Sequence, residues 1–270
     1  MVSSDDALEM LEKTSRTFSI PIGRLPAGLQ EAVASAYLCM RALDEIEDHP
    51  HLQARTKVRL LRAASQVLQA QTEEAHFAGD AFAKIFNARH ALPEVSLRLA
   101  EWACYAPEAI APRIWDATAA MAERMASWIA RGWKIQNEAD LDGYTFAVAG
   151  TVGILLCDIW AWFDGMQMHR SHAIQFGRGL QAVNMLRNRT EDLARGVDFF
   201  PTGWTEVHMT QYALHNLSHA ERYATLLPPG PFASFIQLPL ALAYATLDAL
   251  AAGETKLSRS AVLQLVQRIG

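Results

Sequence analysis

Three carboxylates share one face of a predicted helix that spans residues 27–48. In the segment YLCMRALDEIED, Asp44, Glu47 and Asp48 are spaced three and four residues apart, which places their side chains on one helical face. These like charges repel one another in an apolar surrounding sequence, so the cluster is unfavourable without a cation. Magnesium, which takes oxygen ligands from one or two carboxylates and from phosphate, would remove that penalty. Taken alone, the cluster is equally compatible with a solvated acidic helix end before Pro50.

A second polar stripe lies on a predicted helix over residues 170–195. It contains one cation, Arg187, together with Gln181, Asn184, Asn188, Glu191 and Asp192. A guanidinium in such a setting suits a phosphate oxygen. We expect the two acid-bearing helices to form facing walls of one cavity, because metal ions bridging to a diphosphate would offset the repulsion between them. The two stripes together favour a metal–diphosphate site over chance placement.

The composition limits the classes of protein to which the chain can belong. Of its 270 residues, 51% are apolar and 20% are charged, which is typical of a folded globular protein. The net charge of −5 argues against a nucleic-acid binder. Three dispersed cysteines fit neither a disulfide framework nor a zinc site, which favours a reducing cytoplasm. The acidic N-terminal residues are unlike a signal peptide.

Membrane association is expected to be peripheral at most. No uninterrupted apolar run reaches the roughly 18 residues that a spanning helix needs. An apolar product would suggest delivery to a bilayer, but no basic amphipathic helix marks a docking surface in the sequence. The predicted location is therefore the cytoplasm, with contact at a membrane surface as the alternative.

The dominant period of the sequence is helical. An apolar stripe at spacings of three and four runs from Val33 to Ile46, and prolines mark many of the breaks between such stretches. Alternating strand patterns and internal repeats are missing. We predict one all-α domain over residues 1–270, with helices near 27–48, 54–71, 74–90, 94–105, 108–131, 138–163, 170–195, 205–226, 231–252 and 257–268.

One predicted helix is apolar over most of its circumference. It includes Tyr144 to Trp162, and such a pattern belongs at the centre of a bundle. Gly150 and Gly153 each destabilise a helix interior by up to about 1 kcal/mol, so a close neighbour is expected beside them. Tight helix packing and contact with a ligand are equally compatible with these glycines.

Four segments carry a resemblance to a known family. They are Ser15-Arg16-Thr17-Phe18, then Tyr37-x-x-x-Arg41-Ala42-x-Asp44-x-x-Glu47-Asp48, then Tyr144 with Val148-Ala149-Gly150-x-Val152-Gly153, and finally Leu180-Gln181-x-x-Asn184-x-x-Arg187-Asn188-x-x-Glu191-Asp192 with Phe200-Pro201. In this order, over residues 15–201, they resemble the squalene/phytoene synthase family, the head-to-head isoprenyl diphosphate synthases, and in particular its bacterial squalene synthase-like members. No single motif is specific to this family, but the four motifs in this order are.

The resemblance implies a fold and a set of roles. The fold is a single-domain isoprenoid-synthase helical bundle with a central apolar cavity. The Mg²⁺ ligands or their supports would be Asp44, Glu47, Asp48, Asn188, Glu191 and Asp192. The groups that contact the substrate diphosphate, or organise those contacts, would be Ser15, Arg16, Arg41, Gln181, Asn184 and Arg187. Tyr37 and Tyr144 would lie near the reacting carbocation, with Arg41 as a further catalytic group.

The implied activity is Mg²⁺-dependent condensation of two farnesyl diphosphates through presqualene diphosphate. The product would be squalene, made with NADPH, or a related C30 compound such as dehydrosqualene or hydroxysqualene. The sequence departs from the family pattern at Asn188, where an aspartate is usual, and at Ala147, where a tyrosine is frequent. The alternatives are a single-substrate prenyl diphosphate phosphatase or terpene cyclase, a C40 phytoene-type synthase, and a non-catalytic carrier of apolar ligands.

Overall fold

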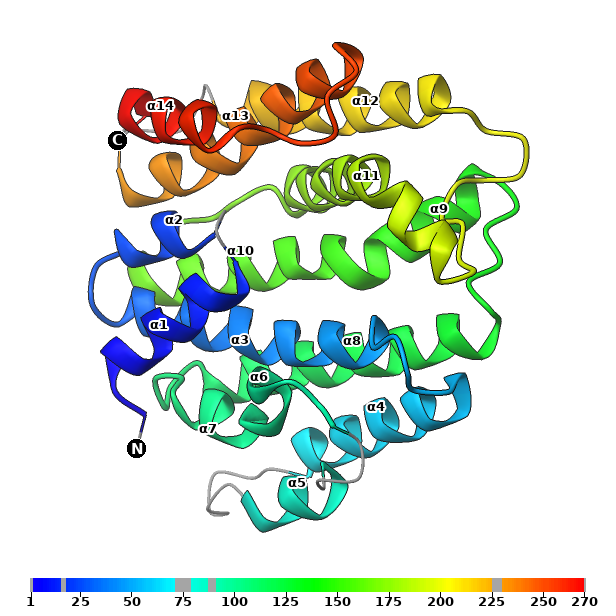
Figure 1. The fold of residues 1–270 in the computed structure, drawn as a ribbon. Coiled ribbons are helices and arrows are strands. Elements are labelled where there is room, and N and C mark those ends of the chain that lie inside the picture. The colour runs from blue at the N-terminus through cyan, green and yellow to red at the C-terminus, as the bar shows by residue number, and fades with distance from the viewer. Residues whose placement is uncertain (1, 16–17, 71–78, 87–90, 225–229, 270) are drawn as a thin grey trace. The chain divides into compact units, whose positions relative to one another are not determined.

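The computed structural model describes residues 2–15, 18–70, 79–86, 91–224 and 230–269, and within these ranges all regular structure is helical (Figure 1). This confirms the predicted all-α class. The elements are α1 Ser4–Thr14, α2 Ser19–Gly23, α3 Leu29–Glu47, α4 Ala54–Gln69, α5 Gly79–Ile85, α6 Glu94–Leu97, α7 Leu99–Cys104, α8 Ala111–Ala130, α9 Glu138–Thr145, the π-helix η2 Phe146–Gly150, α10 Thr151–Asp164, α11 Arg170–Ala194, α12 Glu206–Ala224, α13 Pro231–Ala251 and α14 Arg259–Ile269.

The chain groups into two compact units. Unit 1 comprises Met1–Gly132 and Leu155–Gln167, and unit 2 comprises Trp133–Ile154 and Met168–Gly270. The polypeptide passes between them three times: after α8, within α10 and in the segment that follows α10. The prediction of a single domain stays a prediction.

Most helices fall within a few residues of their predicted bounds. Two short N-terminal helices, α1 and α2, were not predicted. The stretch predicted as one helix over 94–105 is two helices, because Arg98 leaves helical geometry at φ −96° and ψ 15°. The helix predicted over 74–90 is confirmed only as α5, and residues 74–78 and 87–90 lie outside the described part of the chain.

Local signals fix both ends of α3, which carries the first acidic cluster. Gly28 precedes the helix at φ +84°, and the carboxylate of Glu31 accepts a hydrogen bond from the Gly28 N–H at 2.5 Å. This arrangement satisfies one of the N–H groups that the first turn leaves unpaired. Pro50 follows shortly after the last helical residue, and the Lys57 ammonium donates to the carbonyl oxygen of Glu47. The predicted apolar stripe from Val33 to Ile46 is buried except at Tyr37, which is half-buried.

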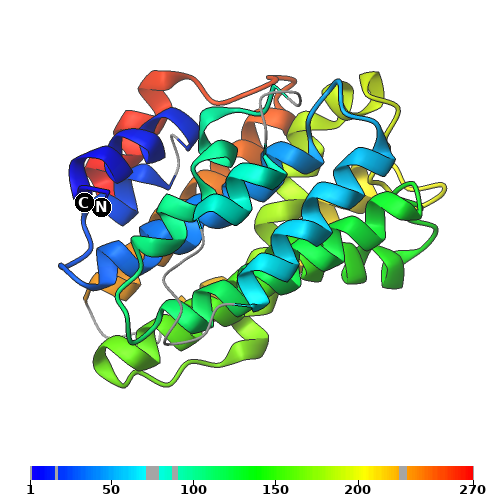
Figure 2. The same cartoon turned by 90° about the horizontal axis from the view of Figure 1, so that it is seen from below.

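Hydroxyl groups from neighbouring helices hold α3 inside unit 1. The buried Ser35 hydroxyl donates to the carbonyl oxygen of Trp102 at 2.7 Å, and the buried Ser96 hydroxyl donates to that of Ala42 at 2.8 Å. These bonds tie α3 to α6 and α7. In the same unit, α4 lies side by side with α8 (Figure 2).

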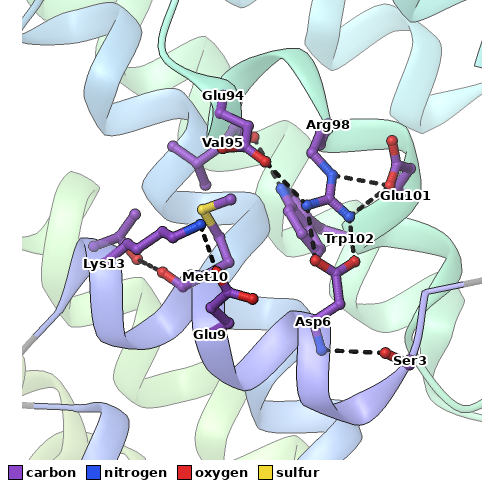
Figure 3. Close-up of polar contacts among 11 residues, drawn as sticks. Ser3, Asp6, Glu9, Met10, Lys13, Glu94, Val95, Arg98, Glu101 and Trp102 are labelled. Carbon is purple, nitrogen blue, oxygen red and sulfur yellow. Dashed lines mark hydrogen bonds and ion pairs between the residues drawn. The ribbon is translucent and has the colours of Figure 1, made fainter.

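Ion pairs of Arg98 connect α1 to α7 (Figure 3). The Arg98 guanidinium forms ion pairs with Asp6 on α1 and with Glu101 on α7. It also lies 4.1 Å from the centre of the Trp102 ring. Because Trp102 is fully buried, this arrangement lets a charged group cover an apolar ring while its own hydrogen bonds are satisfied.

Glycines, in contrast, hold α11 inside unit 2. A Cβ atom added at Gly153 would lie 2.3 Å from the carbonyl oxygen of Ala173, and one added at Gly177 would lie 2.4 Å from that of Ala149. The backbones of η2 and α10 therefore touch the backbone of α11 directly. This confirms tight helix packing as the reason for Gly153, one of the two readings that the sequence left open.

Two helices are long and apolar enough to cross a membrane by length and composition: the continuous helix Glu138–Asp164 and α13. The sequence analysis expected no such segment, because it counted only uninterrupted apolar runs. Core helices of globular proteins pass the same test, and 61% of the most apolar window of α13 is buried. The finding is weak support for membrane association.

Candidate functional site

The N-terminal half of the predicted site assembles on one side of α3. Tyr37 lies beside Ser15, whose side-chain oxygen accepts a hydrogen bond from the backbone N–H of Phe18 at 3.0 Å. The Phe18 and Tyr37 rings are 5.7 Å apart, centre to centre. Burial raises the pKa of Tyr37, so its hydroxyl stays protonated at neutral pH.

Arg41 lies one turn further along the same face. Its guanidinium forms an ion pair with Glu45, a residue that the sequence analysis did not select. The Arg41 Nε atom is buried and makes no hydrogen bond with any described residue. A buried N–H without a partner is unusual, and an anion would satisfy it.

Within the α3 cluster, Asp44 has a clearly shifted pKa. Burial raises the pKa of the Asp44 carboxyl well above its usual value, although the Arg41 charge lowers it. The neighbouring carboxylates Asp48 and Glu47 add to the rise. The like-charge repulsion expected from the sequence is therefore present, and a bound cation would relieve it.

The other two carboxylates of the cluster differ in exposure. Glu47 is buried and Asp48, the cap residue of α3, is exposed. As the described side chains stand, no three His, Cys, Asp or Glu residues are placed to hold one metal ion. Each α3 carboxylate can nevertheless supply one oxygen, which suits Mg²⁺ because it usually takes one or two carboxylates and completes its shell with water and phosphate. By its donor chemistry, this face fits a hard divalent cation.

The predicted second stripe lies on α11 and is arranged differently. Asn184 Oδ1 accepts hydrogen bonds from Arg187 Nη2 at 2.7 Å and from Asn188 Nδ2 at 3.1 Å. Asn188 Oδ1 accepts a third bond from Arg187 Nε at 3.1 Å. These three side chains therefore form one closed network, which we call the α11 amide network. Gln181 is half-buried on the preceding turn.

The carboxylates of this stripe also differ from those on α3. Asp192 is buried and its carboxylate forms an ion pair with Arg195, another residue that the sequence analysis did not select. The helix ends just beyond it, where Gly196 at φ +81° allows the N–H of Val197 to bond the Asp192 carbonyl at 3.0 Å. Glu191 is exposed. With its amide oxygens and Asp192 already engaged, the α11 stripe does not fit a divalent cation as the α3 face does.

Tyr144 lies in unit 2, where its ring stacks on Phe199 at 4.9 Å between centres. It is almost fully buried. A nearby polar network was not predicted: the Tyr212 hydroxyl donates to Asp142 Oδ1 at 2.7 Å, and Arg178 donates to the Asp142 carbonyl oxygen at 3.2 Å. Burial raises the pKa of Tyr212. These residues fall between or beyond the family motifs, so nothing in the sequence marked them.

The predicted site residues are thus brought together in two sets. Tyr37, Arg41 and the α3 carboxylates share unit 1 with Ser15, whereas Tyr144 and the α11 stripe belong to unit 2. Arg16 lies outside the described residues. That the two sets face each other across one cavity stays a prediction.

Comparison with known proteins matches the chain to a family model described as squalene/phytoene synthase over residues 11–214. The squalene synthase of Eremothecium gossypii is 30% identical, over 93% of this chain and 63% of that protein. The squalene synthase of Schizosaccharomyces pombe is 27% identical, over 90% of this chain and 58% of that protein. The chain therefore spans about three fifths of the length of these two relatives.

Solved structures match over nearly the whole chain. TcSQS in complex with the ligand BPH1237 superposes with a TM-score of 0.77 at 22% identity, covering 97% of this chain and 85% of that one. A dehydrosqualene synthase in complex with a ligand superposes with a TM-score of 0.60 at 16% identity, covering 97% and 93%. At these identities the likeness establishes the fold.

Proposed function

The chain belongs to the squalene/phytoene synthase family, and on that basis we propose that it is a prenyltransferase that joins two prenyl diphosphates head to head. Farnesyl diphosphate is the proposed substrate, presqualene diphosphate the intermediate, and squalene or a related C30 compound the product. NADPH would be needed only if the second step is reductive. The observation that carries the proposal is the α3 face, where a half-buried carboxylate with a raised pKa, Asp44, lies among two further acids.

The proposed chemistry starts with departure of diphosphate from an allylic carbon. Mg²⁺, when bound, would supply positive charge that stabilises the leaving group. Asp44 and Asp48 would hold the ion, with Glu47 in support. Arg41 would contribute a fixed positive charge, and its buried Nε, which lacks a partner among the described residues, could donate to a phosphate oxygen.

The carbocation left behind must be kept from water and stabilised. We assign this role to Tyr37 in unit 1 and Tyr144 in unit 2. Both rings pack against a phenylalanine, and an aromatic face attracts a cation. The raised pKa of Tyr37 keeps its hydroxyl neutral, so this side chain would add no charge to the site.

A direct test is incubation with farnesyl diphosphate and Mg²⁺, with and without NADPH, followed by mass spectrometry of the extract. A metal-dependent C30 product is expected, and its hydrogen or oxygen count identifies the second step.

Asp48→Asn should reduce turnover by at least about 100-fold, because each group that stabilises departing charge is typically worth several kcal/mol. Asp116→Asn, which removes an exposed carboxylate on α8, is the matched control. Wild-type turnover in Asp48→Asn would contradict the assignment of the α3 face.

Asn188 favours one alternative, action on a single prenyl diphosphate as a phosphatase or cyclase. The same incubation separates the two activities. Condensation doubles the carbon skeleton, whereas the alternative gives farnesol or a C15 terpene. A C40 product from geranylgeranyl diphosphate alone would instead indicate a phytoene-type synthase.

We also propose peripheral contact with an anionic bilayer through α4. The sequence analysis found no basic amphipathic helix, but α4 buries an apolar face that includes Leu60 and Leu61. Its exposed face carries Arg55, Arg59 and Arg62 along an open groove of 550 Å³. Of these, only Arg62 has an ion-pair partner among the described residues, Glu123 at 3.6 Å. Each such cation near an anionic lipid surface contributes about 1 kcal/mol of binding.

Vesicle sedimentation tests this contact. Binding to phosphatidylglycerol-containing vesicles should fall at least about 10-fold in Arg55→Glu/Arg59→Glu and in high salt. Arg24→Glu/Lys134→Glu makes the same change in net charge at exposed positions elsewhere and should bind like the wild type. Equal loss in both variants would mean that net charge, and not this face, determines binding.

A further inference from the structure

The α11 amide network occupies the atoms that a metal ion would need. Magnesium would bind an asparagine through its side-chain oxygen. Both candidate oxygens already accept hydrogen bonds: Asn184 Oδ1 accepts two, and Asn188 Oδ1 accepts one from Arg187. A cation at Asn184 Oδ1 would have to displace one of its two donors, and a cation at Asn188 Oδ1 would lie next to the Arg187 guanidinium, which carries the same sign of charge. The network therefore disfavours a divalent cation at these oxygens.

The same network leaves Arg187 with binding capacity. A guanidinium has five N–H donors, and the network uses two of its nitrogens, Nε and Nη2. Because amides are neutral, they orient the guanidinium without cancelling its charge. An aspartate at 188 would cancel it, and a metal ion would then be required to attract an anion. Arg187 is exposed, so its remaining donors are accessible.

The acidic residues near Arg187 do not cancel its positive charge. Asp192 is engaged by Arg195, and Arg189 pairs with Asp198 at 3.2 Å. The remaining carboxylate of the stripe, Glu191, is exposed to water. A lone exposed carboxylate is a weak ligand set for Mg²⁺, which needs further fixed oxygens.

We propose that this face of α11 binds a diphosphate directly through Arg187, with no divalent cation between them. Asn184 and Asn188 are positioning residues that hold the guanidinium in its binding orientation. The identity of the ligand as a prenyl diphosphate rests on the proposed function, whereas the metal-independent anion site does not. The α3 face then becomes the part of the chain at which Mg²⁺ acts.

The test is calorimetric titration with inorganic diphosphate on Asp48→Asn, so that the α3 face is weakened as a metal site. Binding is expected in EDTA. It should weaken at least 10-fold in Arg187→Gln, and also in Arg187→Lys, because an ammonium cannot bond both amides and present a flat fork to phosphate. Thr190→Ala, which changes an exposed residue of α11 outside the network, should retain binding. Loss of all binding in EDTA while Arg187 is intact would overturn the proposal.

The variant Asn188→Asp tests directly whether the neutral amide at position 188 makes diphosphate binding independent of metal. In EDTA it should weaken diphosphate binding at least 10-fold, and added Mg²⁺ should restore it, because the new carboxylate both neutralises Arg187 and creates a metal ligand. Unchanged binding in EDTA would contradict the role of Asn188, and circular dichroism checks that each variant folds. If the farnesyl diphosphate incubation gives no product while EDTA-resistant binding persists, the proposed function fails and this inference stands.

Discussion

The two helices that carry the candidate site differ in how their charges are balanced and in how they are held. On α3 the carboxylates lie among one another, and the pKa of Asp44 is raised. On α11 the amides engage Arg187, and Arg195 engages Asp192. Hydroxyl-to-carbonyl bonds secure α3, whereas backbone contact at glycine secures α11. The sequences of the two stripes look alike, yet burial and the neighbouring α3 acids raise the pKa of Asp44, whereas Asp192 and Arg187 on α11 are paired with neighbouring side chains.

The largest effect on stability is expected where Gly153 and Gly177 bring the backbones of neighbouring helices into contact. We call this contact the glycine seam. Gly153→Ala would place a methyl group 2.3 Å from the Ala173 carbonyl oxygen, and the backbone cannot move aside locally. We expect a loss of about 3 kcal/mol or more in the free energy of unfolding, measured by urea denaturation. In Gly23→Ala, where nothing lies within 4 Å, stability should stay within about 0.5 kcal/mol. Equal behaviour of the two variants would show that the seam is not tightly packed.

The next effect concerns the buried carboxylate at the end of α11. Arg195→Ala removes the guanidinium paired with Asp192, leaving a buried negative charge with less compensation. We expect a loss of about 2 kcal/mol, reduced from the value for a fully buried pair because Arg195 is partly exposed. The control is Lys13→Ala, which breaks an exposed pair with Glu9 and should change stability by less than about 0.5 kcal/mol. Chemical denaturation of both variants measures the difference.

A smaller effect is expected where a hydroxyl secures α3. Ser96→Ala removes the buried bond to the Ala42 carbonyl, which should lower the free energy of unfolding by about 1 kcal/mol. Ser218→Ala removes an exposed bond of the same type, to the His215 carbonyl, and should be neutral. If Ser96→Ala were neutral too, the hydroxyl bonds would not be what holds α3.

The smallest effect has the opposite sign. The folded state raises the pKa of Asp44 above its usual value, so the ionised form at neutral pH costs stability. Asp44→Asn removes that charge and should stabilise the protein in EDTA by up to about 1 kcal/mol, while weakening the activity proposed above. Thermal unfolding in EDTA measures it, with Asp116→Asn as the neutral control. Destabilisation would mean that Asp44 is compensated as fully as Asp192.

Much of the fold could be predicted from the sequence because most helices have a clear apolar period and proline breaks. The signal for α1 was present but overlooked: Ser3 caps the helix through the Asp6 N–H at 3.2 Å, with acids in the first turn. The helix break at Arg98 could not be predicted from neighbouring residues. The Arg98 side chain is hydrogen bonded to Asp6, which lies 92 residues away in the sequence.

The site was predictable in residue type but not in pairing. The spacing selected Asp44 and Asp192 equally, yet of the two only Asp192 forms an ion pair with an arginine of the described part of the chain, Arg195. Glu45 and Arg195 were passed over because each is one of several charges within a turn of its partner, and which pair forms depends on burial. Asp142, Arg178 and Tyr212 meet only through the packing of α9, α11 and α12, and no local pattern encodes that.

The glycine seam also bears on how this chain could evolve. Where side chains separate two helices, a smaller or larger residue can widen or narrow the space between them over successive substitutions. At Gly153 and Gly177 the contact is between main chains, so no substitution can bring the helices closer, and any that adds a side chain forces them apart. A lineage that came to accept a ligand of another size would therefore have had to reshape other parts of the protein and leave this seam unchanged.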